Sequence, residues 1–395
     1  MKILMVTPYL PYPPASGGQI RTLNLLKYLS KKNEIVLVCL YKKDSDKRFV
    51  SYLKPFCREI YLCKRSEKPW ALSNILKSIF SFYPFLVVRN YSSEASNTLK
   101  RLLKENTFDV IHTETFYVMP HVPKTKTPIF LVEQTIEFKV YQHFVNSLPF
   151  IFRIFLYPDI MKLKYWERFF WKKATMVATV SDQDKKIVNS MDHSMMPVVI
   201  PNGAGEEMIL ETLEKKDLRH VNLLFQGNFF WLQNVEAANY LIKNIYPKIK
   251  AKFPRITLTI AGQNAKKIQN GNDIIIKDIA HDDTESVKKA YREATLFIAP
   301  IFGPGGTRLK ILAAMACGLP VVSTKIGVEG LDLKDKENVL IADAPDEFVS
   351  KIETILSDPA RYNELRKSAY QLIQKKYNWK QIAQSLETAY SKITS

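Results

Sequence analysis

A glycine-rich turn in the last third of the chain carries groups suited to binding a phosphate. It follows an apolar run, Leu296–Pro300, that predicts a buried parallel strand, and it precedes a short apolar helix. The residues of the turn and of the helix start are Gly305, Gly306, Thr307, Arg308 and Lys310. Backbone N–H groups at such a helix start bind phosphate well, and a bound anion would explain two cations where the helix dipole disfavours them. The pattern indicates a diphosphate site; the alternative is a solvated basic helix start.

Gly17 and Gly18 form a second glycine motif, at the start of an amphipathic helix that ends near Leu29. Apolar residues recur along this helix at helical spacing from Ile20 onward. The helix follows the first predicted strand, Lys2–Thr7, so the glycine pair lies at the carboxyl end of a strand, where ligands bind in open α/β sheets. Because the spacing is not Gly-x-Gly-x-x-Gly, the pair predicts a ligand site but does not require a dinucleotide.

Several ionisable side chains also lie at predicted strand ends. His112 and Glu114 are at the carboxyl end of one strand, and Glu133 and Glu137 follow another as lesser candidates. Such groups suit proton transfer or charge stabilisation, whereas the alternative for His112 is a hydrogen-bonded histidine at a strand end. The segment Asp44–Asp46 has the form of a metal-binding Asp-x-Asp motif, but it falls at a predicted surface turn, and we expect no metal there.

Strand and helix patterns alternate in both halves of the chain, which predicts two doubly wound α/β sheets that face each other across a cleft. The 395 residues suffice for two domains of ordinary size. A turn signal at 201–205 and a polar, irregular stretch at 206–217 mark the boundary. We therefore expect a first domain of residues 1–203 and a second of residues 204–378.

The chain is strongly basic, with a net charge of +18, which favours an anionic partner. Nucleic acid, a membrane surface and a phosphorylated substrate all qualify, but no nucleic-acid recognition motif is present, so we expect no nucleic-acid partner. No apolar run is long enough to span a bilayer, and Met1–Thr7 does not have the form of a secretory signal. The four cysteines have neither metal-site nor disulfide spacing, and free thiols of this kind suggest a cytoplasmic protein.

Two stretches, Ser73–Val88 and Phe150–Lys173, are rich in aromatic residues interleaved with basic ones. This composition predicts an amphipathic surface that contacts an anionic membrane. The alternative is that the rings belong to the core and the cations form a solvated face.

Sequence motifs along nearly the whole chain occur in a characteristic order. They are Thr7-Pro-Tyr, Ser16-Gly-Gly, Phe108-Asp-Val-Ile-His-Thr-Glu114, Val180-Ser-Asp, Ile200-Pro-Asn-Gly203, Gln226-Gly-Asn, Ala261-Gly262, Gly305-Gly-Thr-Arg-Leu-Lys and Ala314-Met-Ala-Cys-Gly-Leu-Pro-Val-Val322. In this order and spacing the chain resembles the retaining, nucleotide-sugar-dependent glycosyltransferases of family 4, which have the GT-B architecture of two Rossmann-like domains.

The resemblance implies that the second domain binds a UDP- or GDP-sugar and the first an acceptor, which is a polysaccharide, a glycolipid or a lipid-linked glycan at the cytosolic membrane face. No metal or further cofactor is implied. The final helix, with residues 379–395, would return to the first domain. Gly17 and Gly18 would approach the donor phosphate and sugar, and the N–H groups of Gly305, Gly306 and Thr307 would bind the diphosphate. Glu114 occupies the place of a histidine in several relatives, so it is the first candidate for a polar contact near the reacting sugar, with His112 second.

The chain also departs from the family pattern. Family members commonly carry a Glu-x7-Glu pair, whose places here hold Gly305 and Ala313, and a methyl group cannot accept hydrogen bonds from ribose. After Gly227, the places of an Arg and a Lys hold Asn228 and Asn234. The nearby Arg308, with the larger role, and Lys310 would then supply the charge for the diphosphate. Two alternatives follow: a nucleotide-sugar epimerase of the same fold, or a nucleotide-sugar-binding pseudoenzyme with an impaired ribose site.

Overall fold

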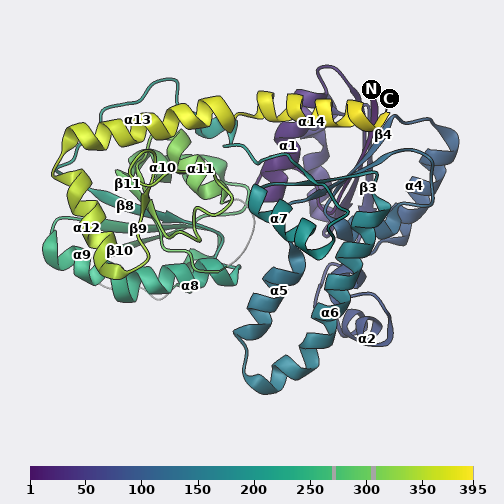
Figure 1. The fold of residues 1–395 in the computed structure, drawn as a ribbon, viewed down its shortest axis with the longest axis horizontal. Coiled ribbons are helices and arrows are strands. Elements are labelled where there is room, and N and C mark those ends of the chain that lie inside the picture. Colours follow the sequence, from purple (N-terminus) through teal and green to yellow (C-terminus); the bar gives the residue numbers. More distant parts are fainter. Residues whose placement is uncertain (269–272, 304–307, 395) are drawn as a thin grey trace. The chain divides into compact units, whose positions relative to one another are not determined.

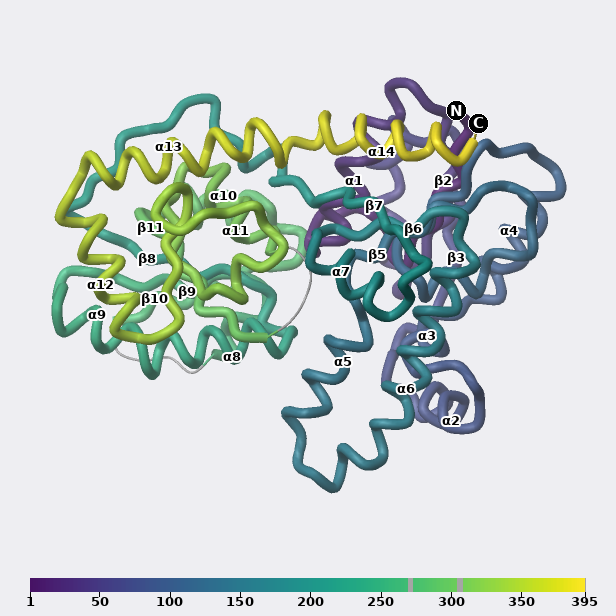
Figure 2. Tube along the Cα trace, viewed as in Figure 1, coloured from purple at the N-terminus to yellow at the C-terminus, as the bar shows by residue number. Residues whose placement is uncertain are grey.

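The computed structural model describes residues 1–268, 273–303 and 308–394. The chain divides into two compact units, Met1–Pro201 with Lys380–Ser395 (unit 1) and Asn202–Trp379 (unit 2). Figures 1 and 2 show the elements of each unit.

Unit 1 is built on a seven-stranded parallel sheet in the order β3-β2-β1-β4-β5-β6-β7. Its strands are β1 (Lys2–Thr7), β2 (Glu34–Tyr41), β3 (Glu59–Lys64), β4 (Val110–Glu114), β5 (Ile129–Glu133), β6 (Met176–Thr179) and β7 (Val198–Val199). Its helices are α1 (Gly17–Leu29), α2 (Leu72–Phe80), α3 (Phe85–Asn90), α4 (Ser93–Glu105), α5 (Glu137–Asn146), α6 (Phe150–Lys173), α7 (Asp182–Met191) and α14 (Trp379–Thr394), with short 3₁₀ segments η1 (Asp44–Tyr52), η2 (Lys54–Phe56) and η3 (Phe116–His121).

The strands of unit 1 are apolar on both faces because helices cover both. Leu4, Val36 and Ile111 pack in one core cluster with Leu99 of α4. Side chains alternate along a strand, so His112 and Glu114 of β4 point to the opposite face, where α1 and α14 supply their partners.

Unit 2 repeats the design with a six-stranded sheet in the order β10-β9-β8-β11-β12-β13. Its strands are β8 (Asn222–Gln226), β9 (Thr257–Gly262), β10 (Ile274–Asp278), β11 (Leu296–Ala299), β12 (Val321–Ser323) and β13 (Leu340–Ile341). Its helices are α8 (Leu232–Tyr240), α9 (Tyr246–Lys252), α10 (Thr284–Glu293), α11 (Leu309–Ala316), α12 (Pro345–Leu356) and α13 (Pro359–Lys376), with a π turn at Leu241–Ile245 and 3₁₀ segments η4 (Glu206–Met208) and η6 (Ala265–Lys267). The prediction of two doubly wound parallel sheets is confirmed.

The strand order reverses once in each sheet, between β1 and β4 in unit 1 and between β8 and β11 in unit 2. Loops that follow the two strands at such a point leave in opposite directions, and the gap between them is the usual ligand site of an open α/β sheet. This identifies two places to inspect: the segments after Thr7 and Glu114, and those after Gln226 and Ala299.

Helix α6 divides the aromatic and basic stretch Phe150–Lys173 into two parts. In its second half Leu163, Phe170 and Trp171 are buried in the core. Its first half has large exposed side chains instead: Phe150, Ile151, Phe152, Ile154 and Phe155. Figure 1 shows α2 beside this helix, and the Lys162 ammonium group donates to the backbone carbonyls of Ser78 and Ser81. The core interpretation therefore holds for Leu163, Phe170 and Trp171, and does not hold for the first half of α6 or for Tyr165, which is exposed.

Candidate functional site

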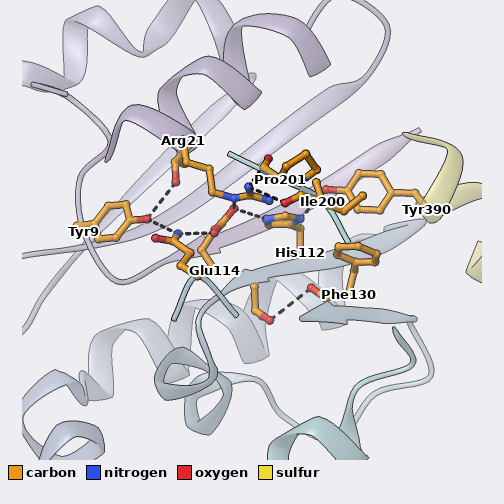
Figure 3. A network of polar contacts seen from close by, with 11 residues as sticks. Tyr9, Arg21, His112, Glu114, Phe130, Ile200, Pro201 and Tyr390 are labelled. Atoms are coloured by element: carbon orange, nitrogen blue, oxygen red, sulfur yellow. Dashed lines mark hydrogen bonds and ion pairs between the residues drawn. The ribbon is translucent and has the colours of Figure 1, made fainter. Parts of the chain in front are cut away.

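A buried polar network lies at the strand reversal of unit 1 (Figure 3). Glu114 is the last residue of β4. Its carboxylate accepts a hydrogen bond from His112 Nε2 at 2.9 Å and forms an ion pair with Arg21 Nε at 3.3 Å. Its other carboxylate oxygen accepts from the amide of Gln134. The side chains of Arg21, His112 and Glu114 are wholly buried. The strand period of two puts residues 112 and 114 on one face, so the histidine and the carboxylate meet without any loop between them.

Helices α1 and α14 bring the other members of the network. Arg21 lies one turn into α1, and its Nη1 donates to the carbonyls of Ile200 and Pro201, each at 3.1 Å. The Tyr390 hydroxyl of α14 lies 2.6 Å from His112 Nδ1. With Nε2–H donating to the carboxylate, a neutral His112 accepts from Tyr390, and the ring is held from both ends.

The charge of Glu114 is maintained despite its burial. Burial raises the pKa of this carboxyl group, but the charge of Arg21 and the hydrogen bonds from His112 and Gln134 outweigh it and lower the pKa to about 2. Glu114 is therefore a fixed anion at neutral pH, and all its described partners are donors. Such a group orients its neighbours more readily than it transfers a proton.

The network reaches the surface at Tyr9 and Gln134, which are partly exposed. Gln134 Nε2 donates to the Tyr9 hydroxyl at 2.7 Å, and this hydroxyl also lies 3.2 Å from Thr22 Oγ1. A Cβ atom on Gly18 would lie 2.4 Å from Tyr9 Oη and 2.6 Å from Gln134 Oε1, so only glycine leaves room for both side chains. Gly17 begins α1 beside them and is exposed. We name Tyr9, Gly18 and Gln134 the rim of the unit 1 site.

The lesser candidates after β5 belong to a separate buried group of carboxyls. Glu133 accepts from Trp171 Nε1 at 2.7 Å, and Glu167 of α6 accepts the first two backbone N–H groups of α5 at 2.7 and 3.0 Å. Burial raises the pKa of Glu133 and of Glu167, and raises that of Glu137 to about 7. These contacts join α5 to α6. Asp44 of the Asp-x-Asp segment forms ion pairs with Lys47 and Lys64.

At the strand reversal of unit 2, Lys310 of α11 lies against the loop after β8. Its ammonium group donates to Asn234 Oδ1 at 2.5 Å and lies 5.0 Å above the Phe225 ring. A Cβ atom on Gly227 would lie 3.0 Å from Lys310 Nζ. Burial, and then the charge of Arg308, lower the pKa of Lys310 to about 7. Within the described residues no carboxylate forms an ion pair with Lys310.

The neighbouring residues hold the β8 loop close to β9. Gly262 has a φ of +131°, and a Cβ atom there would lie 2.0 Å from the Gly227 carbonyl oxygen. Asn228 donates to Gln263 Oε1 at 2.9 Å, and its own carbonyl accepts from Asn234 at 2.7 Å. These contacts make a tight turn whose backbone can approach a ligand closely.

Arg308 precedes α11 directly, and its Nη2 donates to the Gly303 carbonyl at 2.5 Å. Ala313 lies within α11 and is 9% exposed. Gly305, Gly306 and Thr307 lie outside the described residues, so their role remains a prediction.

Sequence reasoning singled out Gly18, His112 and Glu114 but missed the side chains that surround them. Arg21 had a signal, since a cation inside an otherwise apolar helix face requires a partner. Tyr9 belonged to the first loop motif without a role. Tyr390 had no local signal, because it lies 278 positions from its partner His112.

Two family models match the chain. Residues 15–206 match Glycosyltransferase Family 4, and residues 220–358 match Glycosyl transferases group 1. A Klebsiella pneumoniae protein, described as an uncharacterized 44.6 kDa protein in the cps region, is 26% identical over an alignment of 404 positions that covers 98% of each chain.

Solved structures with the same fold cover almost the whole chain. Sucrose-phosphate synthase from Thermosynechococcus elongatus superposes with a TM-score of 0.73 at 15% identity, over 100% of this chain and 99% of that one. Anabaena HepE in complex with UDP-glucose superposes with a TM-score of 0.65 at 13% identity, over 99% and 100%. The predicted GT-B fold is thereby confirmed.

Proposed function

The chain belongs to the glycosyltransferases of the family 4 and group 1 type, and from this premise we propose its substrates and mechanism. It transfers a sugar from a UDP- or GDP-sugar, with retention of the anomeric configuration, to a glycan or lipid-linked acceptor at the cytosolic face of a membrane. Unit 2 binds the donor and unit 1 the acceptor.

The observation that carries this proposal is the environment of the Lys310 ammonium group. A partly buried ammonium group with an amide oxygen and an aromatic ring as partners is unfavourable, as its lowered pKa expresses. It lies at the strand reversal of unit 2, beside a turn whose glycines allow a ligand to approach the backbone. A diphosphate would supply the missing negative charge. The HepE complex with UDP-glucose has the same fold, which is consistent with a nucleotide sugar as donor.

Each candidate residue then has a defined part. Lys310 and Arg308 stabilise the charge that develops on the leaving diphosphate, which is the main electrostatic requirement of the reaction. The backbone of Gly227 and the N–H groups of Gly305, Gly306 and Thr307 bind the same group, while Asn228 and Asn234 hold the turn. On the acceptor side the rim residues contact the reacting sugar, and Glu114 with His112 positions them. Gly17 and Gly18 admit the donor sugar to this rim.

The membrane part of the proposal rests on α2 and the first half of α6. Exposed apolar side chains gather on both: Leu72, Ile79 and Phe80 on α2, and Phe150, Phe152 and Phe155 on α6. Arg153 lies among them and lines an apolar hollow of about 570 Å³ with Tyr157 and Met161. Apolar rings beside cations match an anionic bilayer surface, where the rings enter the interface and the cations meet lipid phosphates. No helix in the described ranges has the length and apolarity needed to cross a membrane.

Nucleotide binding tests the donor site. We expect calorimetric titration with UDP, GDP and their sugar conjugates to show binding, and Arg308→Ala and Lys310→Met each to weaken it at least tenfold, since a charge-assisted hydrogen bond contributes about 1.5–3 kcal/mol. Lys289→Met, at an exposed lysine of α10, is the matched control. Unchanged affinity in both variants would refute the assignment. Ala313→Glu should bind the nucleotide more tightly if the ribose site lacks a hydrogen-bond acceptor. If the wild-type chain and Ala313→Glu both bind nucleotide but transfer no sugar, the chain is a pseudoenzyme.

Flotation with vesicles tests the membrane surface. The chain should float with phosphatidylcholine vesicles that contain a third of phosphatidylglycerol, and less with phosphatidylcholine alone. Phe152→Ser with Phe155→Ser should abolish flotation, whereas Met196→Ser, at an exposed residue elsewhere in unit 1, should not. Equal flotation of all three forms would contradict the assignment of this surface.

A further inference from the structure

Three cations gather at the carboxyl edge of the unit 1 sheet, where β2 and β3 end. Lys42 follows β2 directly and Arg65 follows β3. The two strands end in register, with Tyr41 opposite Lys64, and the Arg65 N–H donates to the Tyr41 carbonyl at 3.0 Å. Lys42 and Arg65 therefore leave the same edge of the sheet side by side.

Helix α3 adds the third cation. The Arg65 guanidinium donates to the side-chain oxygen of Asn90, the last residue of α3, and Arg89 is the residue before it. The Arg89 guanidinium carbon lies 5.5 Å from the Phe85 ring centre and 5.9 Å from that of Tyr141. All three cations are partly buried, and we name Lys42, Arg65 and Arg89 the cation cluster.

The cluster has no ion-pair partner among the residues that the structure describes. The nearby carboxylates are used elsewhere: Asp46 accepts from the Lys43 N–H, and Asp159 accepts from Phe85 N–H and Ser78. Glu137 faces Arg89, but burial raises its pKa to about 7, so this carboxyl group is only partly ionised at neutral pH. Arg65 Nε is buried without a hydrogen-bond partner.

Gathering like charges in this way works against the stability of the fold. Burial, followed by the charges of Arg65 and Arg89, lowers the pKa of Lys42 to about 8. Three converging cations with an unused N–H donor are the arrangement that binds a phosphate or diphosphate, because guanidinium forks match phosphate oxygens and the anion removes the repulsion.

We propose that the cation cluster binds the phosphate or diphosphate of a lipid-linked acceptor. The inference rests on the proposed function and specifies its acceptor. Strands β3, β2, β1 and β4 are neighbours, so about 14 Å of sheet edge separates Arg65 from Glu114, at roughly 4.8 Å per strand. That interval leaves room for an acceptor sugar between the cluster and the rim.

The exposed apolar surface adjoins the cluster through Phe85, which Arg89 contacts. Helix α3 follows α2 in the chain, and Phe85 of α3 stacks on Trp70 with ring centres 4.7 Å apart. Figure 2 shows α2 and α3 next to α6. The lipid part of the acceptor would lie along α2 and the first half of α6, so that lipid, diphosphate and sugar follow one another along unit 1.

Calorimetric titration of the full chain with farnesyl diphosphate, inorganic diphosphate and farnesol tests this site. Lys310→Met is used as the parent, which weakens binding at the diphosphate site proposed in unit 2. Farnesyl diphosphate should bind at least tenfold more tightly than inorganic diphosphate, and both should bind less tightly at higher salt. Lys42→Met and Arg89→Gln should each weaken both ligands at least tenfold. Lys43→Gln and Arg101→Gln remove exposed cations of the same unit and should change affinity less than twofold.

Thermal unfolding separates a binding role from a structural one. Lys42→Met should raise the melting temperature while it weakens diphosphate binding, whereas a structural lysine would lower both. Unchanged affinity in Lys42→Met and Arg89→Gln overturns the site. Equal affinity for inorganic diphosphate and farnesyl diphosphate would overturn the lipid-linked acceptor as the ligand. The cluster would then be a site for free phosphate or diphosphate. A chain that binds farnesyl diphosphate through the cluster but binds no nucleotide refutes the proposed transferase and retains the anion site.

Discussion

The pair of Arg21 and Glu114 allows the sharpest test of the unit 1 network. Replacing Arg21 by Met keeps the unbranched part of the side chain, removes the guanidinium group, and leaves a buried carboxylate with only His112 and Gln134. Breaking a buried pair from one side costs about 3–5 kcal/mol. The pKa of Glu114 falls from 4.5 to about 2 on folding, which is the net result of burial, which raises it, and of Arg21, His112 and Gln134, which together lower it. This shift corresponds to about 3 kcal/mol at roughly 1.4 kcal/mol per pKa unit.

The assay must report on unit 1 alone, because a two-unit chain need not unfold in one step. Hydrogen exchange of peptides that cover β4 gives the free energy of opening at that strand. We expect Arg21→Met to lower it by about 3 kcal/mol. Arg58→Met removes the exposed pair with Glu34, at 2.6 Å, and should cost at most about 1 kcal/mol. Equal costs for the two variants would refute the reasoning.

The pH dependence provides a second check on the same residue. A carboxyl group whose pKa is lower in the folded state stabilises the fold above its unfolded value, and this contribution is lost as the pH falls. For Glu114 the loss should run from about pH 4.5 down to about pH 2. The difference between the wild-type chain and Arg21→Met should therefore shrink over that range. A constant difference would show that the lost contacts to Ile200 and Pro201, not the charge, determine the cost.

Two further predictions concern the rim and the donor site. Gly18→Ala should displace Tyr9 and Gln134 and lower kcat at least tenfold with nucleotide affinity unchanged; a transfer rate equal to that of the wild-type chain would contradict the crowding at Gly18. At pH 8, binding of UDP or GDP should take up a proton, because the pKa of Lys310 rises from about 7 when a diphosphate neutralises its surroundings. Calorimetry in buffers of different ionisation enthalpy measures this proton uptake. If Lys310→Met still takes up a proton on nucleotide binding, a group other than Lys310 is responsible.

The strands of this fold could be predicted closely because parallel strands in a doubly wound sheet are apolar on both faces. The strand Lys2–Thr7 was expected with the bounds that the structure has, and the run Leu296–Pro300 ends one residue beyond β11. Helices α2 and α5 were missed. Helix α2 is short and largely apolar, and the start of α5 depends on the distant Glu167 carboxylate, which no local pattern reveals.

The site residues show the same difference: some could be predicted from the neighbouring sequence, and others depend on distant partners. Gly18 and Lys310 lie in the first turns of α1 and α11, where the glycines and charges are visible in the sequence. His112 and Glu114 were expected as candidates near the reacting sugar, and their burial behind Tyr9 and Gln134 depends on partners from α1 and α14. The cation cluster was missed because Lys42, Arg65 and Arg89 come from three segments and converge only through the strand order.

The bond between Tyr390 and His112 also bears on how the protein is made. Arg21 and His112 leave the ribosome early in synthesis, whereas Tyr390 emerges only after all of unit 2 has been translated. Until then His112 lacks the hydroxyl that holds its Nδ1, and the network behind the rim is incomplete. A nascent chain can therefore fold much of unit 1 and still hold an unfinished polar network there, and this network is completed only after unit 2 has been translated.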